Sequence, residues 1–312
     1  MKPSRLAGAG ILVAILAIAW LVVHRRDAKT RSVDASPEIV VVHREVRVEP
    51  AAGTARYRVR LLKIPNLPGQ RVLSEDWSEP PTEFGTDPAG DWVGWDVVSP
   101  AQPRVFSGRT HVEVRNAGLS APPRSLAADP DPSGFLGSDT FRHVGDASIA
   151  RMASSVGGSD TLSRLRGIWD AVIAHMRYGG YDPESRGSVH AATSGVGDCT
   201  EFADLFVAMA RSLGIPARRM DGWTPAWKGT LRHAWVEAWI PSRGWTAFDP
   251  TWGESGSASF EKLSTARIVA SWNPSSIAVE HRSYGAWRWW GASPSFVWRD
   301  SVWPPNNAER GE

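Results

Sequence analysis

Residues 195–206 read G-V-G-D-C-T-E-F-A-D-L-F, and the cysteine in this stretch, Cys199, is the only one in 312 residues. From Asp198 onward apolar residues recur at helical spacing until Gly214 ends the pattern. Asp198 is a suitable N-cap, and Glu201 three residues later completes a capping-box pattern. The stretch therefore predicts an amphipathic helix with Cys199 at its first position.

The start of a helix favours a thiolate. Unpaired backbone N–H groups and the helix dipole stabilise an anion there, which predicts that the pKa of Cys199 lies below the usual thiol value of about 8.5. The carboxylates of Asp198 and Glu201 act in the opposite direction. The helix alone therefore does not ionise the sulfur, and a histidine partner is required.

A histidine lies on the next segment with a clear pattern. Residues 232–240 alternate in polarity, which is typical of a half-buried strand. Residues 241–244, Pro-Ser-Arg-Gly, indicate a tight turn, and residues 245–248 return as a second strand. One face of the first strand carries Ala234, Val236, Ala238 and Ile240, and the other carries His233, Trp235, Glu237 and Trp239.

The length of this turn decides whether His233 and Asp249 share a face. A three-residue turn, with Ile240 opposite Gly244, places Asp249 across from Trp235 and diagonal to His233. A plain four-residue turn places the two side chains on opposite faces. A bulge at Gly244 would fix the register, but the sequence leaves both registers open.

Cys199, His233 and Asp249 are the residue types that nucleophilic sulfur chemistry requires: a thiol, a base and a group that orients the base. A lone cysteine is more often a small buried apolar residue, so the combination carries the argument rather than any one member. The trio lacks the paired spacing of structural zinc sites. We therefore expect neither a metal nor another cofactor.

Four motifs occur in a fixed order: residues 195–206, then L-G-I-P-A-R-R-M-D-G-W at 213–223, H-A-W-V-E-A-W at 233–239 and G-W-T-A-F-D-P-T-W at 244–252. With these motifs, residues 162–252 resemble the bacterial transglutaminase-like superfamily, which has a papain-like core. The resemblance implies an α+β fold in which the nucleophile helix packs on an antiparallel sheet carrying the other two residues.

By the same resemblance, Cys199 is the nucleophile, His233 the general base and acid, and Asp249 the residue that orients His233. Such a triad transfers an acyl group from a carboxamide through a thioester. Water as the second nucleophile gives a peptidase or amidase, and a lysine amine gives a cross-linking protein-glutamine gamma-glutamyltransferase. Because many membrane-anchored bacterial relatives are hydrolases, we favour hydrolysis of protein or cell-wall peptide. A non-catalytic module that binds envelope peptide is the alternative from another class.

Further site residues are expected around the triad. The backbone N–H of the nucleophile is one expected oxyanion donor, as the helix start suggests. Tyr178 is the candidate for the second donor, with Tyr181 and His190 as rivals; an ordinary core or surface aromatic is the other interpretation of Tyr178. Trp223 and Trp235 are candidate substrate contacts.

The N-terminus contains an apolar run at residues 6–23, just long enough to span a bilayer. It predicts a transmembrane anchor; a signal peptide cleaved at Ala17-Ile18-Ala19 is the alternative. The four basic residues at 25–31 outnumber those before the run, which by charge alone favours a cytoplasmic domain. The usual placement of the family favours an extracytoplasmic one, periplasmic or extracellular.

Composition restricts the partners. The single cysteine excludes an intramolecular disulfide, so stability must come from an apolar core. The net charge of +2 provides no strong field, and we expect no nucleic-acid partner. The expected partners are therefore a protein or peptide substrate, including cell-wall peptide, and the membrane through residues 6–23.

The domain organisation follows from Pro/Gly punctuation and from short alternating runs that indicate a small β-rich domain ahead of the core. The expected divisions are an anchor or signal at 1–26, a linker at 27–37, the β-rich domain at 38–120, a Pro-rich linker at 121–137, the catalytic core at 138–255 and a Trp-rich extension at 256–312.

The C-terminal extension departs from the family pattern, because residues 253–259 are rich in Gly and Ser where relatives continue with a strand. Its tryptophans fit a surface for stacking glycan or peptide, or a belt at a lipid interface. We favour an aromatic strand that packs back on the core.

Overall fold

The structure is a computed structural model that describes residues 37–67, 69–87, 90–115, 131–182, 184–224, 231–263, 267–271 and 284–303. The chain divides into two units, residues 1–34 and 35–312, and the described residues all belong to the second. The apolar run at 6–23 and most of the Pro-rich linker lie outside the described residues. Within the ranges above, no helix has the length and apolar character needed to cross a membrane.

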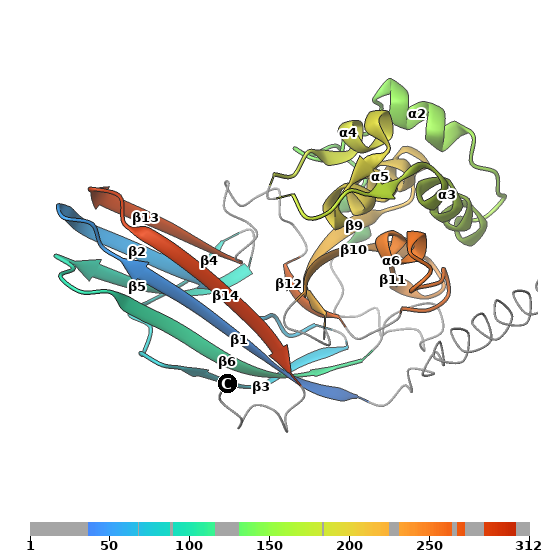
Figure 1. The fold of residues 1–312 in the computed structure, drawn as a ribbon. Coiled ribbons are helices and arrows are strands. Elements are labelled where there is room, and N and C mark those ends of the chain that lie inside the picture. The colour runs from blue at the N-terminus through green and yellow to red at the C-terminus, as the bar shows by residue number, and fades with distance from the viewer. Residues whose placement is uncertain are drawn as a thin grey trace, which may run out of the picture. The chain divides into compact units, whose positions relative to one another are not determined.

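The core combines helices with an antiparallel sheet in the order β11-β10-β9-β12 (Figure 1). The strands are β9 (Ala217–Thr224), β10 (Leu231–Ile240), β11 (Gly244–Phe248) and β12 (Ile268–Ser271). The helices are α2 (Ala147–Ser154), α3 (Thr161–His175), α4 (Gly187–Ser194), α5 (Cys199–Ser212) and α6 (Pro250–Glu254), with a short 3-10 turn, η2 (Pro132–Phe135). The motifs implied this arrangement, a nucleophile helix packed on an antiparallel sheet.

Helix α5 is the central element of the core. Its side chains pack against the alternating apolar face of β10, including Ala234, Val236 and Ala238, in one buried cluster. The Asp198 side chain accepts from the Thr200 N–H at 2.8 Å and forms the predicted capping box with Glu201. An N-cap of this kind stabilises a helix by about 1 kcal/mol. The capping box is therefore confirmed, whereas the half-exposed faces expected for α5 and β10 are wrong: residues 200–211 of α5 and both faces of β10 are buried.

The hairpin from β10 to β11 has the three-residue register. Ile240 pairs with Gly244, and the pairing continues to Val236 opposite Phe248. The Arg243 N–H donates to the Ile240 carbonyl at 2.9 Å, and Gly244 has a φ of 80°. An L side chain rarely adopts this backbone conformation, so the glycine permits the turn that carries Asp249 toward His233.

A close approach explains another glycine of the motif. A Cβ atom on Gly197 would lie 2.4 Å from the Glu201 Cβ, too near for any side chain. The short strand β8 (Val196–Gly197) pairs in parallel with β7 (Arg177–Tyr178), so Tyr178 lies opposite Gly197. This pairing places Tyr178 beside the entry to α5.

Two further sheets form a β-sandwich, with strand orders β14-β1-β6-β3 and β13-β2-β5-β4. A buried cluster of valines and aromatic rings, among them Tyr57, Trp95 and Phe106, joins the two sheets. The strands are β1 (Glu38–Glu49), β2 (Thr54–Leu62), β3 (Gln70–Trp77), β4 (Glu83–Asp87), β5 (Gly90–Val98), β6 (Arg104–Val114), β13 (Gly285–Gly291) and β14 (Ser295–Trp303).

Strands β13 and β14 correct the expectation of a separate extension at 256–312. Each is an edge strand of one sandwich sheet: β13 pairs with β2 and β14 with β1 (Figure 1). The tail therefore adds edge strands to the N-terminal β-rich region, and β14 also contacts the catalytic core through Asp300. The pairing is between segments more than 200 residues apart, which local sequence patterns do not reveal.

Hydrogen bonds join the sandwich to the core. The Asp300 carboxylate of β14 accepts from Arg232 Nε at 2.6 Å and from Trp223 Nε1 at 3.1 Å. The Gln70 side chain exchanges two hydrogen bonds with the Val269 backbone of β12, at 2.7 and 3.0 Å. Around these contacts, buried residues of the sandwich and of the core form one cluster. The sandwich therefore directly supports the catalytic sheet.

Candidate active site

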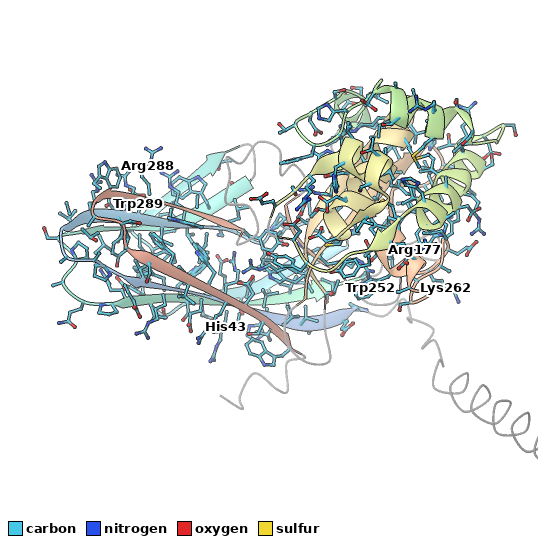
Figure 2. All side chains as sticks on the ribbon, turned by 45° about the horizontal axis from the view of Figure 1, so that its top comes forward. His43, Arg177, Trp252, Lys262, Arg288 and Trp289 are labelled. Atoms are coloured by element: carbon cyan, nitrogen blue, oxygen red, sulfur yellow. The ribbon has the colours of Figure 1, made fainter. Side chains whose placement is uncertain are left out.

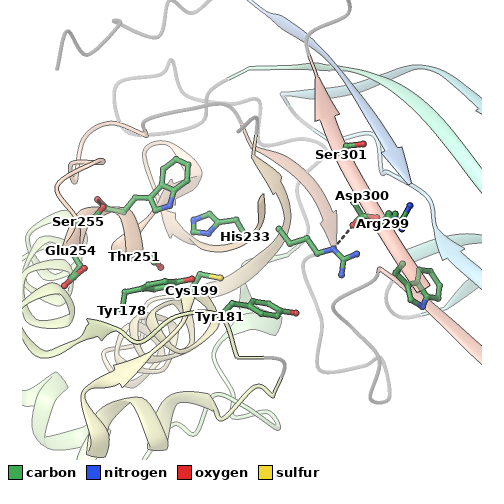
Figure 3. A pocket seen from close by; sticks show the side chains of 13 residues that line it. Tyr178, Tyr181, Cys199, His233, Thr251, Glu254, Ser255, Arg299, Asp300 and Ser301 are labelled. Atoms are coloured by element: carbon green, nitrogen blue, oxygen red, sulfur yellow. Dashed lines mark hydrogen bonds and ion pairs between the residues drawn. The ribbon is translucent and has the colours of Figure 1, made fainter. Parts of the chain in front are cut away.

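A pocket of about 880 Å³ opens beside Cys199 and His233 (Figure 3). Its walls come from the start of α5, helix α6 with its C-cap, strand β10, the segment around β7 and strand β14. The lining residues are Tyr178, Tyr181, Cys199, Arg232, His233, Thr251, Trp252, Glu254, Ser255, Trp298, Arg299, Asp300 and Ser301.

The imidazole of His233 is held by Asp249. Its Nε2 lies 2.7 Å from Asp249 Oδ2, and both side chains are buried. Because Nε2–H donates to this carboxylate, the neutral ring carries its lone pair on Nδ1, a tautomer inferred from the hydrogen bond. Nδ1 is therefore the ring nitrogen available to accept the proton of Cys199, which lies on the same pocket wall (Figure 3).

Asp249 is fixed by two further donors. Its Oδ1 accepts from the Trp252 backbone N–H at 3.1 Å as the N-cap of α6, and Arg267 forms an ion pair with Oδ2. Burial acts to raise the pKa of Asp249, but the charges and hydrogen bonds of His233 and Arg267 outweigh it and hold this pKa well below its usual range. The carboxylate therefore stays ionised throughout the neutral range.

Aromatic rings restrict the orientation of the imidazole. The Trp252 ring lies 5.1 Å from the His233 ring at 27°, and the Trp235 ring lies 6.3 Å away at 22°. The Arg267 guanidinium lies over the Trp252 ring, 4.8 Å from its centroid. Rings held this way limit rotation of His233 and keep Nδ1 directed at the pocket.

The sulfur environment corrects the expected direction of the thiol pKa. Cys199 is half-buried, and burial raises its pKa, with the Asp198 carboxylate acting in the same direction. A hydrogen bond from the Ala234 backbone N–H opposes this rise, while Asp221 and Asp249 add to it. The carboxylates and the partial burial therefore outweigh the helix start, and Cys199 rests as a neutral thiol that gives up its proton only to a base.

The effect of Asp198 on Cys199 can be tested by alkylation. Asp198→Asn retains an N-cap acceptor but removes one negative charge, so the pKa of Cys199 falls and the thiolate fraction near pH 7 increases. We expect labelling by iodoacetamide at pH 7 to become several-fold faster than in the unmodified protein, with mass spectrometry following the single thiol. Asp170→Asn, on the exposed face of α3, serves as the control and should leave the rate unchanged. Equal rates in all three proteins would show that Asp198 does not set the reactivity.

The other candidate residues separate into two groups. Tyr178 and Tyr181 line the pocket, and Tyr178 is 48% exposed with its pKa raised by burial and by the nearby Cys199. His190 lies on α4, makes a contact of 3.3 Å with Ser194 and is not among the pocket residues.

The expectation that Trp223 and Trp235 contact substrate needs correction, because both indoles are buried and neither lines the pocket. Trp223 packs against Tyr284 and donates to Asp300, whereas Trp235 stacks near His233. Trp252 lines the pocket instead, and its backbone N–H donates to Asp249, the N-cap three residues earlier. No sequence pattern identified Arg267 as the ion-pair partner of Asp249.

No group of three or more His, Cys, Asp or Glu side chains suited to a metal ion occurs among the residues that the structure describes.

Residues 150–250 match the family model of the transglutaminase-like superfamily. The matched residues include Cys199, His233 and Asp249. Over 84 residues the chain is 33% identical to the uncharacterized protein YebA of Bacillus subtilis (strain 168), a match that covers 22% of this chain and 11% of YebA.

Over 66 residues the chain is 38% identical to a protein-glutamine gamma-glutamyltransferase of Pseudomonas aeruginosa, a match that covers 18% of this chain and 10% of that protein. The chain thus spans about a tenth of the length of these two relatives. Among solved structures, a candidate cysteine protease from Cytophaga hutchinsonii superposes with a TM-score of 0.59 at 17% identity, over 86% of this chain and 91% of that chain. This likeness shows a shared fold.

Proposed function

We propose that the protein catalyses cysteine-dependent acyl transfer from a carboxamide or peptide bond, with Cys199 as nucleophile, His233 as base and acid, and Asp249 as the orienting group. The observation that carries the proposal is the hydrogen bond of 2.7 Å between His233 Nε2 and Asp249, which leaves Nδ1 free beside Cys199. The match of residues 150–250 to the transglutaminase-like family model also supports the proposal.

The steps follow from the neutral thiol. Nδ1 of His233 accepts the thiol proton as the sulfur attacks the carbonyl carbon, and the ionised Asp249 stabilises the resulting imidazolium. The imidazolium then gives its proton from Nδ1 to the leaving amine or ammonia, and a thioester remains on Cys199. A second nucleophile loses its proton to Nδ1 as it attacks the thioester. Collapse of that intermediate releases the acid or new amide and returns the proton to the sulfur.

The oxyanion would form between the Cys199 backbone N–H, which has no partner within its helix, and the hydroxyl of Tyr178. The position of Tyr178 opposite Gly197 and in the pocket supports this role. We expect Tyr178→Phe to lower kcat by about 10²-fold with little change in KM, since the hydroxyl would act mainly on the transition state. Tyr181→Phe is the matched control on the same pocket. If both variants kept the full kcat, the second donor would have to come from elsewhere.

Water is the second nucleophile that we favour, which makes the protein a peptidase or amidase acting on protein or cell-wall peptide. The half-buried sulfur opens onto a large pocket that admits water to a thioester. Transfer to a lysine amine is the alternative, and the 38% identity to a protein-glutamine gamma-glutamyltransferase over 66 residues supports it.

Partitioning of the thioester distinguishes the two reactions. A glutamine-containing peptide incubated with the protein and increasing concentrations of a primary alkylamine should yield mainly free acid and ammonia if water is preferred. Product dominated by the alkylamide at millimolar amine would instead establish the transferase. Neither product, together with retained peptide binding, would identify a non-catalytic peptide-binding module.

We also propose that the catalytic part lies outside the cytoplasm, anchored through residues 6–23. Support comes from the length of the apolar run at residues 6–23. The basic residues at 25–31 favour the opposite orientation, so the experiment has to test the topology directly. Protease added to intact spheroplasts should digest the catalytic part, whereas protection until lysis would place it in the cytoplasm. Release into the soluble fraction would identify a cleaved signal.

A further inference from the structure

Strand β14 approaches the candidate catalytic pocket through its edge. Four consecutive residues of this strand, Trp298 to Ser301, line the same pocket as Cys199 and His233. Successive side chains of a strand point to opposite faces of the sheet. A pocket that contacts all four therefore reaches the strand from the side and not from one face.

That side is the outer edge of the sheet. Among the described strands, β14 pairs only with β1, which occupies its other side. An edge strand carries alternate backbone N–H and C=O groups that are not used within the sheet and that can pair with another extended chain. The groove thus offers main-chain hydrogen-bonding groups close to the candidate nucleophile.

We propose that this edge is a substrate subsite: an extended segment of a polypeptide adds as a further strand to β14 and is thereby led across Cys199. This inference rests on the proposed function, because the bound segment is taken to be the acyl donor. Recognition through the main chain would make the enzyme tolerant of sequence and selective for unfolded or extended polypeptide.

The β14 edge is tied to the catalytic strand. Asp300 of β14 accepts from Arg232 Nε at 2.6 Å, and Arg232 directly precedes His233 on β10. An ion pair of this kind, with Asp300 nearly buried, fixes the spacing between the edge and the imidazole. The segment that pairs with β14 would therefore meet the triad in a defined register.

Arg299 gives the subsite a charge preference. It is exposed, lines the pocket and forms no ion pair among the residues that the structure describes, whereas the neighbouring Asp300 is already engaged. Because alternate side chains of an added strand face the same way, an acidic residue can reach Arg299 only from every second position of the substrate. The subsite therefore favours an acidic side chain at alternate positions of the added substrate strand.

Peptide binding to the Cys199→Ala protein tests the proposal without turnover. The probes are fluorescein-labelled ten-residue peptides with one central glutamine, in which a single glutamate moves along the chain one position at a time. Anisotropy should show affinities that alternate with position on one side of the glutamine, by about two- to fivefold, the size of a partly exposed ion pair. Methylation of single peptide nitrogens should weaken binding by about two- to tenfold, again only at alternate positions.

Charge reversal supplies the matched control. In the Cys199→Ala background, Arg299→Glu should invert the preference so that a lysine series binds better at the same positions. Arg288→Glu lies on β13, the edge of the other sheet, outside the pocket, and should leave the pattern unchanged (Figure 2). The absence of alternation, or equal effects of Arg299→Glu and Arg288→Glu, would overturn the proposal.

Failure of this subsite is distinguishable from failure of the proposed function. The unmodified protein is treated with the same peptides, and mass spectrometry detects acyl-Cys199. Acyl-Cys199 without alternating affinity overturns the β14 subsite and leaves the triad intact. Alternating affinity without acyl-Cys199 supports the β14 edge as a binding site and counts against the triad.

Discussion

Replacement of His233 with alanine is expected to lower kcat/KM for carboxamide cleavage by about 10²–10⁴-fold, the usual contribution of a positioned general acid and base. The loss should be large because Cys199 rests as a thiol whose pKa is raised by burial and by Asp198, so little thiolate exists without a proton acceptor. Progress curves on a glutamine-containing peptide, with release of ammonia or amine as the readout, measure the effect.

Two variants make the result specific to the imidazole. His190→Ala changes a histidine on α4 that is not among the pocket residues and should retain full activity. His233→Gln should be as impaired as His233→Ala, because a side-chain amide hydrogen-bonds but does not take up a proton. Activity of His233→Ala within a few-fold of the unmodified protein would remove His233 from the mechanism.

Asp249→Ala should destabilise the fold by about 3–5 kcal/mol, the cost of removing one partner from a buried ion pair. The change removes the ion pair between Asp249 and the buried Arg267 and the acceptor of His233 and of the Trp252 N–H. Chemical denaturation followed by tryptophan fluorescence measures the loss. Catalysis should fall as well, since the imidazole loses the group that sets its tautomer.

A double variant separates the loss of the Asp249–Arg267 ion pair from the other effects of Asp249→Ala. Arg267→Met removes the cation, so Asp249→Ala/Arg267→Met should be less destabilised than the sum of the two single variants. Additive effects would show that the two side chains do not stabilise each other.

The Asp249 contribution also has a defined pH dependence. The folded pKa of Asp249 lies below its unfolded value, so the stabilisation is present above the unfolded pKa of about 3.9 and is lost as pH falls toward the folded one. The stability difference between the unmodified protein and Asp249→Ala should therefore narrow as pH falls below about 4. A difference that instead grew on acidification would contradict the assigned direction.

Much of the catalytic core follows from short-range patterns. The capping box at Asp198, the alternation along β10 and the turn at Gly244 all act within about ten residues, so the sequence predicts α5, the hairpin and their contact. The turn length was the open point, and the Ile240–Gly244 pair resolves it.

Other features depend on contacts that no local pattern contains. The partners of β13 and β14 are β2 and β1, which lie more than 200 residues away, so no local pattern predicts the place of these strands in the sandwich. The ion pair between Arg267 and Asp249 depends on how the chain folds back after α6, which no local pattern predicts. The direction of the Cys199 pKa depends on a balance between the helix start, the carboxylates and burial, and burial is known only from the packed structure.

The most direct test of the central claim is the mass of the protein after rapid acid quench of a reaction with a glutamine-containing peptide. We expect an adduct of the peptide mass less ammonia, on Cys199, the only cysteine of the chain. The adduct should be absent from Cys199→Ala and strongly reduced in His233→Ala. Substrate turnover in the unmodified protein with no adduct on Cys199, or turnover that persists in Cys199→Ala, would contradict the account.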